Sequence, residues 1–505
     1  MAAVTTQALT RSLARVPADE RATLILLALF VMAWTIFHTI VFSPFGLHPD
    51  LTEVYDWGRH PALGYYKHPP LSGWICGLWF LVFPASDWAF QLLAMVNAAA
   101  GLFVADRIAR RYLPADKRLM ALLLLLLTPF YQFIAQKFNV NAVLLWSWPL
   151  AVYCFLRAFE TRALTWSIAA GAACALAMLG KYYSIYLVAG IVIGALTHPK
   201  TTRYLASPSP WISAITGIVV LAPHVWWLVE TGYQPFTYAY IVHGTTGLGA
   251  VLLSLPGYLA GAIGYVALPT VLVLLLARPN RQQVAETLWP RDAELRMLAI
   301  MQGAFLLLPA LWTPLFGIEL TSLWSMQSWF LLPTLLLAPA STRLPRHAGK
   351  RLAIGIAIFT AVALLASPVL AWINFSRPSK DDRGYSRQLA EDVTRQWQEL
   401  TGKPLSIAIG DNNLAASVEF YGASHPDSVA FLDLKTAPWV TAERMRKEGW
   451  AGVCNAANAN CIAGVSDFVA GNPRVARHNI EITPTLFGYR APPATFAVIL
   501  VPPQP

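Results

Sequence analysis

Charged residues are scarce in this chain of 505 residues. Asp, Glu, Lys and Arg together make up 13% of it, whereas a typical soluble domain carries roughly 25%. Hydrophobic residues reach 56%, so the chain is neither a disordered protein nor a coiled coil. Cysteine is scarce too, because only five are present, which excludes a small disulfide-stapled scaffold. We find no internal repeat and no low-complexity segment.

Long apolar runs fill the first 373 residues. A helix that crosses a bilayer needs about 20 mostly apolar residues, and lipid leaves no partner for unpaired backbone groups. The sequence therefore predicts an α-helical polytopic membrane protein with about 11 transmembrane helices. The predicted spans are 22–42, 88–105, 119–136, 141–159, 164–179, 185–197, 211–229, 249–277, 297–315, 320–338 and 352–373. The run 71–83 is too short to span, and we interpret it as an interfacial or re-entrant helix.

Basic residues are distributed unevenly between the two ends of these spans. With a cytoplasmic N-terminus, 20 of the 37 Lys and Arg residues fall on the cytoplasmic side, and only four fall on the other side before residue 375. This asymmetry is typical of positive-inside membrane proteins. After residue 375, thirteen basic residues are balanced by thirteen acidic residues, so this part carries no net charge. The excess positive charge of +10 therefore lies on the predicted cytoplasmic side, where it sets the orientation of the protein beside anionic lipid. Nucleic acid is not an expected partner.

The composition divides the chain into three parts. A cytoplasmic lead covers 1–21, a membrane domain covers 22–373 with its first periplasmic loop at 43–87, and a periplasmic domain covers 375–505. In the last part, strand-length apolar runs alternate with helical patterns, which predicts a small C-terminal α/β domain. The expected strands are 405–410, 429–434, 451–454 and 495–501, and the expected helices are 412–421 and 442–450. We expect a multi-pass protein of the bacterial inner membrane.

The five cysteines follow the same division. Cys76, Cys154 and Cys174 lie in or beside apolar segments, where a thiol usually packs as a small hydrophobe. Cys454 and Cys461 both lie in the predicted periplasmic domain, where an oxidising compartment permits a structural disulfide. Two free thiols are the alternative for this pair. A zinc site is not expected there, because no nearby histidine pair or second cysteine pair completes it.

The first external loop is the segment richest in chemistry. Residues 43–70 read SPFGLHPDLTEVYDWGRHPALGYYKHPP and contain three carboxylates and three histidines. A plain connector between two spans needs only a few residues. A carboxylate just outside a span can act on a lipid headgroup, either as a general base or by orienting an acceptor.

This loop resembles the first external loop of integral-membrane glycosyltransferases that use polyprenyl-phosphate sugars, the GT-C relatives of protein O-mannosyltransferases and the lipid A aminoarabinose transferase. Asp50 takes the acidic position of that loop, and residues 64–71, Gly-Tyr-Tyr-Lys-His-Pro-Pro-Leu, take its closing motif. Looser similarity extends over 137–159, 179–182 and 223–236 and covers most of 20–375. Leu51, Asn141 and Lys67 depart from positions at which the family often carries an acidic residue.

The resemblance implies that Asp50 is the catalytic carboxylate. The sequence also permits a local role, because Asp50 followed by Glu53 has the form of a helix capping box, in which Glu53 is the partner. Asp56 lies six residues after Asp50, off its face in a helix. We keep Asp56, Glu53 and Glu230 as possible acceptor contacts or a second acid.

A cation near the donor phosphate would stabilise the charge on the leaving group. Lys181 is the first choice, although a lysine at the end of a span can simply extend to the interface. Tyr182 beside it either binds the same phosphate or belongs to the interfacial aromatic belt. The other predicted phosphate contacts are His68, Arg59 and Lys67.

A metal site is not predicted. His48, His60 and His68 lie in the loop, but no two have i,i+4 spacing. A divalent metal is conceivable for the reaction but is not supported by the sequence, and no other cofactor is expected.

The resemblance implies transfer of a sugar from a polyprenyl-phosphate donor to an envelope acceptor on the periplasmic side, by an inverting single displacement. The acceptor would be lipid A, lipopolysaccharide core, another glycan or a protein. A transporter or lipid flippase is an alternative, but it predicts mid-span charges and paired repeats. A catalytically inactive envelope scaffold is another, suggested by Leu51 and Asn141.

Overall fold

A computed structural model describes residues 18–244, 247–339, 342–377, 382–469 and 474–504. The chain forms two compact units. The helical unit consists of Met1–Trp34, Ala94–Gln136 and Val140–Ala361, and the sheet unit consists of Thr35–Leu93, Lys137–Asn139 and Val362–Pro505. Most of the predicted cytoplasmic lead, residues 1–17, lies outside the described residues.

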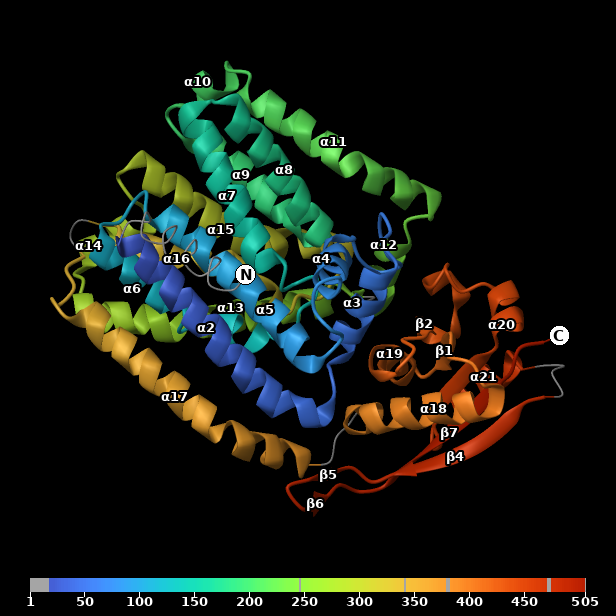
Figure 1. Cartoon of the computed structure of the whole chain (residues 1–505). Coiled ribbons are helices and arrows are strands. Elements are labelled where there is room, and N and C mark those ends of the chain that lie inside the picture. Colours follow the sequence, from blue (N-terminus) through green and yellow to red (C-terminus); the bar gives the residue numbers. More distant parts are fainter. Residues whose placement is uncertain (1–17, 245–246, 340–341, 378–381, 470–473, 505) are drawn as a thin grey trace, which may run out of the picture. The chain divides into compact units, whose positions relative to one another are not determined.

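Helices long and apolar enough to cross a membrane dominate the described residues. Six qualify by length and composition: Glu20–Phe45, Asp87–Ala109, Ser209–Glu230, Leu248–Ala277, Ala293–Phe316 and Ala348–Phe375. They correspond to α2 (Ala18–Phe42), α5 (Asp87–Ala109), α11 (Ser209–Glu230), α13 (Leu248–Ala277), α15 (Ala293–Phe316) and α17 (Ala348–Phe375) (Figure 1). The prediction of a mostly helical membrane protein is confirmed, and the count of eleven spans stays a prediction.

Shorter helices complete the helical unit. They are α6 (Ala115–Leu125), α7 (Leu144–Thr161), α8 (Leu164–Gly180), α9 (Ile185–Thr197), α10 (Thr201–Leu205), α12 (Gln234–His243), α14 (Arg281–Leu288) and α16 (Leu332–Leu337). Helix α8 packs between α7 and α11. A Cβ atom on Gly171 of α8 would lie 2.1 Å from the Ser213 carbonyl oxygen, so the small residues of α8 permit close approach of α11.

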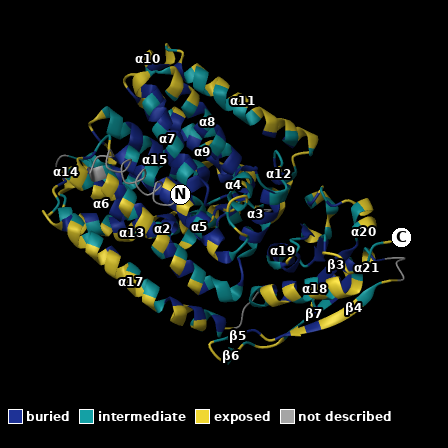
Figure 2. Cartoon of the chain, viewed as in Figure 1, coloured by how far each residue is buried: buried dark blue, intermediate teal, exposed yellow. Residues whose placement is uncertain are grey.

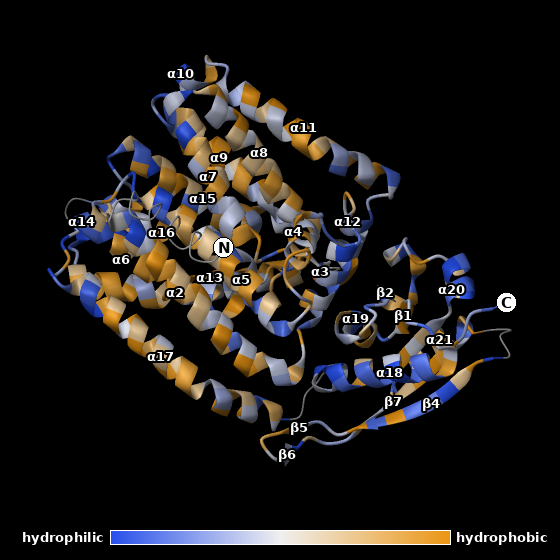
Figure 3. Ribbon diagram, viewed as in Figure 1, coloured by the Kyte–Doolittle hydropathy of each residue, from blue (hydrophilic) through white to orange (hydrophobic). Residues whose placement is uncertain are grey.

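The outer faces of the long helices are apolar and exposed. Figure 2 shows exposed residues along α11 and α17, and Figure 3 shows that these helices are largely hydrophobic. Leu365 is 82% exposed, Ile218 is 68% exposed and Leu253 is 83% exposed. Soluble proteins rarely expose such continuous apolar surface, which fits helices that face lipid.

Two predicted spans are not continuous α-helices. The segment 119–136 is interrupted after α6, and a π-helix, Phe130–Ile134, follows Pro129. The segment 320–338 begins as a 3₁₀-helix, Ser322–Leu331, before α16 takes over with Pro333 in its first turn. Proline lacks a backbone N–H and so removes one hydrogen bond from a helix, although α11 and α13 continue through internal prolines. An apolar run therefore does not guarantee one uninterrupted helix.

The C-terminal part of the sheet unit has the predicted α/β character. Its five-stranded sheet has the order β2-β1-β3-β7-β4, in which β1 pairs in parallel with β2 and β3, and β7 pairs antiparallel with β3 and β4. The strands are β1 (Ile407–Gly410), β2 (Asp427–Val429), β3 (Trp450–Asn455), β4 (Ala476–Ile482) and β7 (Ala494–Val501). A separate hairpin joins β5 (Thr485–Leu486) to β6 (Tyr489–Arg490).

Helices cover both faces of this sheet. One core contains Leu389, Trp397 and Leu414 from α18 (Ser386–Thr401) and α19 (Asn412–Tyr421). The other contains Met445 and Val465 from α20 (Ala442–Glu448) and α21 (Ala459–Asp467). Alternate residues of β1 face opposite cores, as the twofold period of a strand requires.

Parts of this domain differ from the sequence prediction. The predicted strand 429–434 is wrong, because β2 ends at Val429 and the chain turns through Phe431 and Leu432, both at φ 55°. Such left-handed backbone cannot continue a strand. The sequence analysis also missed α18, α21 and β4. In β4, exposed Arg477, His478 and Asn479 hide the strand pattern, as is common on the edge of a sheet.

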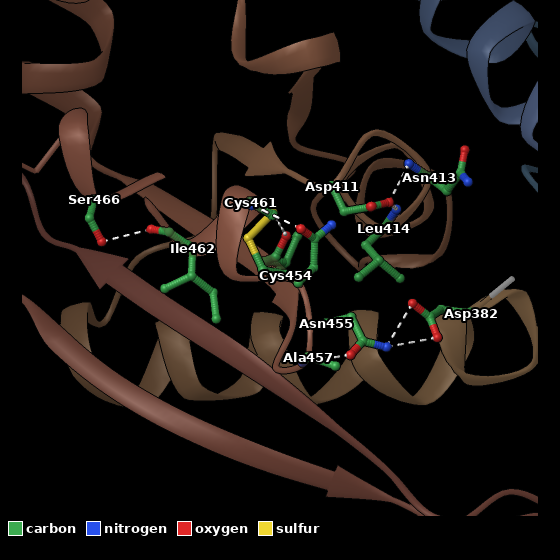
Figure 4. The surroundings of a disulfide bond; sticks show 12 residues. Asp382, Asp411, Asn413, Leu414, Cys454, Asn455, Ala457, Cys461, Ile462 and Ser466 are labelled. Carbon is green, nitrogen blue, oxygen red and sulfur yellow. Dashed lines mark hydrogen bonds between the residues drawn. A yellow bond between two sulfur atoms is a disulfide. The ribbon is translucent and has the colours of Figure 1, made fainter. Parts of the chain in front are cut away.

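Cys454 and Cys461 form a disulfide between β3 and α21 (Figure 4). Their Cα atoms are 5.8 Å apart, within the ordinary range for such a bridge. Asn458 caps α21 by accepting a hydrogen bond from the Cys461 N–H at 3.1 Å. The bridge and the cap together fix the start of α21 against the sheet.

The first external loop folds into two short helices of the sheet unit, α3 (Pro49–Arg59) and α4 (Leu71–Phe80). They cross where glycine faces glycine. A Cβ atom on Gly77 would lie 2.4 Å from the Gly58 carbonyl oxygen, and one on Gly58 would lie 2.6 Å from the Gly77 nitrogen. This crossing fixes α3, which carries the predicted catalytic residue, against α4.

We expect Gly77→Ala to destabilise the protein by about 1–3 kcal/mol, the usual cost of overpacking, because backbone atoms leave no room for the methyl group. Thermal unfolding of the chain in detergent, followed by tryptophan fluorescence, measures the effect. The control is Gly264→Ala in α13, where an added Cβ meets nothing within 4 Å. Equal melting temperatures of Gly77→Ala and wild type would contradict this account of the crossing.

Candidate functional site

Helix α3 begins two residues earlier than a capping box at Asp50 requires. His48 is the N-cap, Pro49 is the first helical residue, and the Asp50 N–H donates to His48 Nδ1 at 3.2 Å. Proline suits this position because its missing N–H would have no helical partner anyway. The local capping-box interpretation of Asp50 and Glu53 is therefore wrong. The Asp50 carboxylate is left for another purpose near the positive end of the helix dipole.

The Asp50 carboxylate is held but remains reachable. Asn139 Nδ2 donates to Asp50 Oδ2 at 2.8 Å. The Asp50 side chain is 42% exposed. Burial alone would raise the pKa of Asp50, but contacts with His48 and Asn139 and the charge of Lys67 lower it more. The net shift places the pKa of Asp50 below its ordinary value, so the group is ionised at neutral pH.

Glu53 and Lys67 form an ion pair in the interior of the loop. Lys67 Nζ lies 2.5 Å from Glu53 Oε1, and the two side chains are only 14% and 15% exposed. The Tyr66 hydroxyl donates to the same oxygen at 2.8 Å. Burial raises the pKa of Glu53, while Lys67 and Tyr66 partly oppose the shift. These contacts favour a structural role for both residues over the predicted acceptor and phosphate contacts.

Aromatic packing closes the loop. Tyr65 and His68 form an antiparallel bridge through two backbone hydrogen bonds of 3.0 and 3.1 Å. The Tyr65 ring stacks on Trp57 at 4.9 Å, and its hydroxyl donates to the Trp57 carbonyl oxygen at 2.6 Å. The His68 ring meets Trp57 edge-on. The closing motif therefore shapes the loop, and the phosphate contact of His68 stays a prediction.

The last turn of α3 faces the C-terminal domain within the sheet unit. Arg59 Nη1 lies 2.8 Å from Glu419 Oε1, and its Nη2 lies 3.2 Å from Asp427 Oδ1. His60 Nε2 lies 3.0 Å from the same Asp427 oxygen and 3.9 Å from Asp56 Oδ1. Arg59 is thus engaged by carboxylates, which favours positioning of α3 over the predicted phosphate contact.

Asp56 and Glu419 are buried carboxyl groups close to each other. Burial raises the pKa of both, and the neighbouring Glu419 raises that of Asp56 further. Asp56, Glu419 and His60 each offer a ligand atom, and these atoms lie within 4.8 Å of one another. Among the residues that the structure describes, this group is the one able to hold a metal ion.

Lys181 lies in the helical unit, between α8 and α9. Its ammonium donates to Asn141 Oδ1 at 2.7 Å and lies 4.5 Å from the centre of the Trp324 ring. Burial lowers the pKa of Lys181 to about 7. Because its hydrogen-bond acceptor is a neutral amide, the charge of Lys181 is not cancelled by that contact.

Tyr182 belongs to an aromatic group beside Lys181 in the same unit. Its hydroxyl lies 3.0 Å from His224 Nε2, and its ring stacks on Phe236 at 4.7 Å. His224 in turn stacks on Trp227. Glu230, at the end of α11, is exposed. The roles predicted for Tyr182 and Glu230 stay predictions.

Asn139 and Glu419 were not predicted as contributors, and Asn141 was noted only as a departure from the family pattern. Asn139 and Asn141 lie just after the apolar run 119–136 and contact Asp50 and Lys181, respectively. Glu419 lies in the C-terminal domain and meets α3 across a long stretch of sequence. One local signal was available, because Asp56 and His60 have the i,i+4 spacing that places two side chains on one face of a helix.

The chain is similar in sequence to known membrane glycosyltransferases. The profile of the dolichyl-phosphate-mannose-protein mannosyltransferase family matches residues 67–227. The lipid A galacturonosyltransferase RgtD of Rhizobium johnstonii is 22% identical over 206 residues, or 40% of this chain and 43% of that protein. The match therefore spans less than half the length of this curated relative.

The fold is also that of a solved relative. ArnT from Cupriavidus metallidurans bound to undecaprenyl phosphate has a TM-score of 0.60 over 94% of this chain and 97% of its own, at 16% identity. Its apo structure has the same TM-score over 95% of this chain and 98% of its own. The resemblance to polyprenyl-phosphate-dependent GT-C glycosyltransferases is confirmed.

We expect Lys67→Met to destabilise the protein by about 3–5 kcal/mol, the usual effect of leaving one charge of a buried pair without its partner. Thermal unfolding in detergent measures the loss. The double variant Glu53→Gln/Lys67→Met should recover most of it, because the unpaired charge is then gone. A double variant no more stable than Lys67→Met alone would show that the ion pair does not explain the effect.

Proposed function

We propose that this chain is an inner-membrane glycosyltransferase that transfers a sugar from a polyprenyl-phosphate donor to an envelope acceptor on the periplasmic side. The fold shared with ArnT and the sequence similarity to a lipid A galacturonosyltransferase support this proposal. Lipid A is the first acceptor to test. A uronic acid or aminoarabinose donor follows from the same resemblance.

The observation that carries the proposal is a pair of charged groups held by neighbouring asparagines. Asn139 donates to the Asp50 carboxylate, and Asn141 accepts from the Lys181 ammonium. The two asparagines are two positions apart in the sequence. Each group suits one part of the reaction, because an anion stabilises positive charge on the anomeric carbon and a cation stabilises the departing phosphate.

The proposed step is a single displacement at the anomeric carbon. The bond from this carbon to the phosphate oxygen breaks with its electron pair, and the polyprenyl phosphate leaves. A bond forms to the acceptor oxygen on the opposite face, and a hydroxyl acceptor passes its proton to the Asp50 carboxylate. Lys181 stabilises the departing phosphate, and Tyr182 contributes a hydrogen bond.

Asp50 serves this step chiefly as an anion that orients the acceptor and faces the electron-poor anomeric centre. A general base works best when its pKa lies near the operating pH, and the pKa of Asp50 is lowered instead. The approach of a second anion, the donor phosphate, would raise it. Proton removal by Asp50 is therefore best suited to the donor-bound state.

The departures from the family pattern are compatible with activity. Leu51 is only 1% exposed, so the residue at this position points into the loop core and does not face a substrate. Asn141 accepts the same hydrogen bond from Lys181 that an aspartate would accept, but it adds no negative charge. The ammonium of Lys181 is therefore left with its charge for a phosphate.

We expect Asp50→Asn to lower transfer by at least about a hundredfold, the usual effect of removing one electrostatic contact to a transition state, because asparagine keeps the shape but not the charge. The assay uses proteoliposomes with radiolabelled polyprenyl-phosphate galacturonic acid or aminoarabinose and extracted lipid A. Glu399→Gln, at an exposed position of α18, is the control and should transfer normally. Wild-type rates in Asp50→Asn would refute the proposed role of Asp50.

We expect kcat/KM for the donor to fall above pH 7 in the wild-type protein. Lys181 is protonated below its pKa of about 7 and loses its charge as the pH rises. Well above the pKa, the charged fraction of Lys181 falls about tenfold for each pH unit. Lys181→Arg keeps a charge throughout and should remove this decline between pH 7 and 9. A decline of equal size in both proteins would assign it to another group.

A further inference from the structure

A group of metal-ligating side chains joins α3 to α19 within the sheet unit. Asp56 and His60 lie one helical turn apart at the end of α3, and Glu419 lies in α19, which packs against α3. Their ligand atoms lie within 4.8 Å of one another. The His60 ring stacks on Trp439 at 4.2 Å with an angle of 11° between the planes, which fixes the plane of the imidazole.

Two carboxylate oxygens in this group accept no hydrogen bond from any residue that the structure describes: Asp56 Oδ1 and Glu419 Oε2. Asp56 is 8% exposed and Glu419 is 0% exposed, so bulk water does not solvate them. A buried polar atom without a partner is destabilising, and more so when it is charged. Two such atoms facing one small space indicate that a ligand belongs there.

The surrounding charges also leave room for a cation. Arg59 pairs with Glu419 and Asp427, and Arg444 pairs with Asp427 and Glu448, whereas Asp56 Oδ1 lies 3.9 Å from His60 Nε2. If His60 binds a metal and gives up its contact with Asp427, Asp427 still has both arginines as partners.

We propose that Asp56, His60 and Glu419 bind one divalent transition-metal ion, and that Zn²⁺ fits best. Zinc accepts imidazole nitrogen together with carboxylate oxygen, whereas Mg²⁺ and Ca²⁺ prefer oxygen ligands alone. Tetrahedral ligands at about 2.1 Å lie roughly 3.4 Å apart, so small side-chain rotations close the site.

This ion ties the first external loop to the C-terminal domain and does not take part in the transfer. Asp56 follows Asp50 by six residues, which is about 9 Å along a helix. The metal therefore acts at the opposite end of α3 and holds that helix against α19. This role accounts for a histidine and two carboxylates that the proposed reaction does not use.

The test measures metal bound to the full chain in detergent. Wild-type protein, stripped with a chelator and dialysed against Zn²⁺, should retain about one zinc per chain by mass spectrometry. Its melting temperature should rise with Zn²⁺ and not with Mg²⁺ at the same concentration. Asp56→Asn and Glu419→Gln should each lower the bound zinc at least tenfold. Glu448→Gln, which removes a carboxylate of the same network outside the group, should bind zinc as the wild type does.

Either of two results would overturn the proposal. One is wild-type protein that retains no zinc, manganese or cobalt after dialysis, which would mean that Asp56 and Glu419 share a proton instead. The other is zinc binding that persists in Asp56→Asn and Glu419→Gln. If both variants fail to fold, Co²⁺ bound to the stripped wild-type protein decides. The visible spectrum of a tetrahedral nitrogen–oxygen site supports the proposal, and its absence refutes it.

Discussion

The need to pair charges along α3 is the constraint on which the rest of the sheet unit depends. Eleven residues place three carboxylates and one guanidinium on this helix, and a poorly solvated charge is costly without a partner. Each partner comes from a different part of the chain: Asn139 for Asp50, Lys67 for Glu53, and Glu419 for Arg59. Pairing these charges requires Asn139, the closing motif of the loop and the C-terminal domain to meet at one short helix.

The membrane character and the α/β nature of the C-terminal domain could be predicted because both depend on local apolar patterns. The helix expected at 412–421 matches α19, and the strand expected at 451–454 lies within β3. Failures occurred where backbone chemistry overrides that pattern. Pro129 and Pro333 interrupt apolar runs, and the left-handed residues after Val429 end a strand. The exposed polar side chains of β4 conceal an edge strand, because an edge needs little apolar surface.

The candidate site was likewise predictable in part: some of its residues could be chosen from the sequence, but their contacts could not. Asp50, Glu53, Asp56 and Lys67 could be chosen from one loop, but their roles depend on contacts that the sequence does not reveal. Lys67 was predicted as a phosphate ligand, and its ion pair with Glu53 could not be foreseen from the sequence. Glu419 carried no signal at all, since an isolated glutamate in an amphipathic helix is ordinary. The spacing of Asp56 and His60 was visible, but a histidine-only search for metal ligands passes over a carboxylate one turn away.

The pKa values of Asp50 and Lys181, the two groups proposed for the reaction, affect their charges in opposite ways. This difference agrees with the charges that develop in the transition state. Asp50 is ionised before the donor arrives, so it would repel the phosphate and is better placed beside the sugar, where positive charge builds on the anomeric carbon. Lys181 is held near the midpoint of its titration by burial. An incoming phosphate raises its pKa and draws a proton onto it. Lys181 thus gains its full charge when the leaving group arrives, without requiring a permanently charged ammonium in the protein interior beforehand.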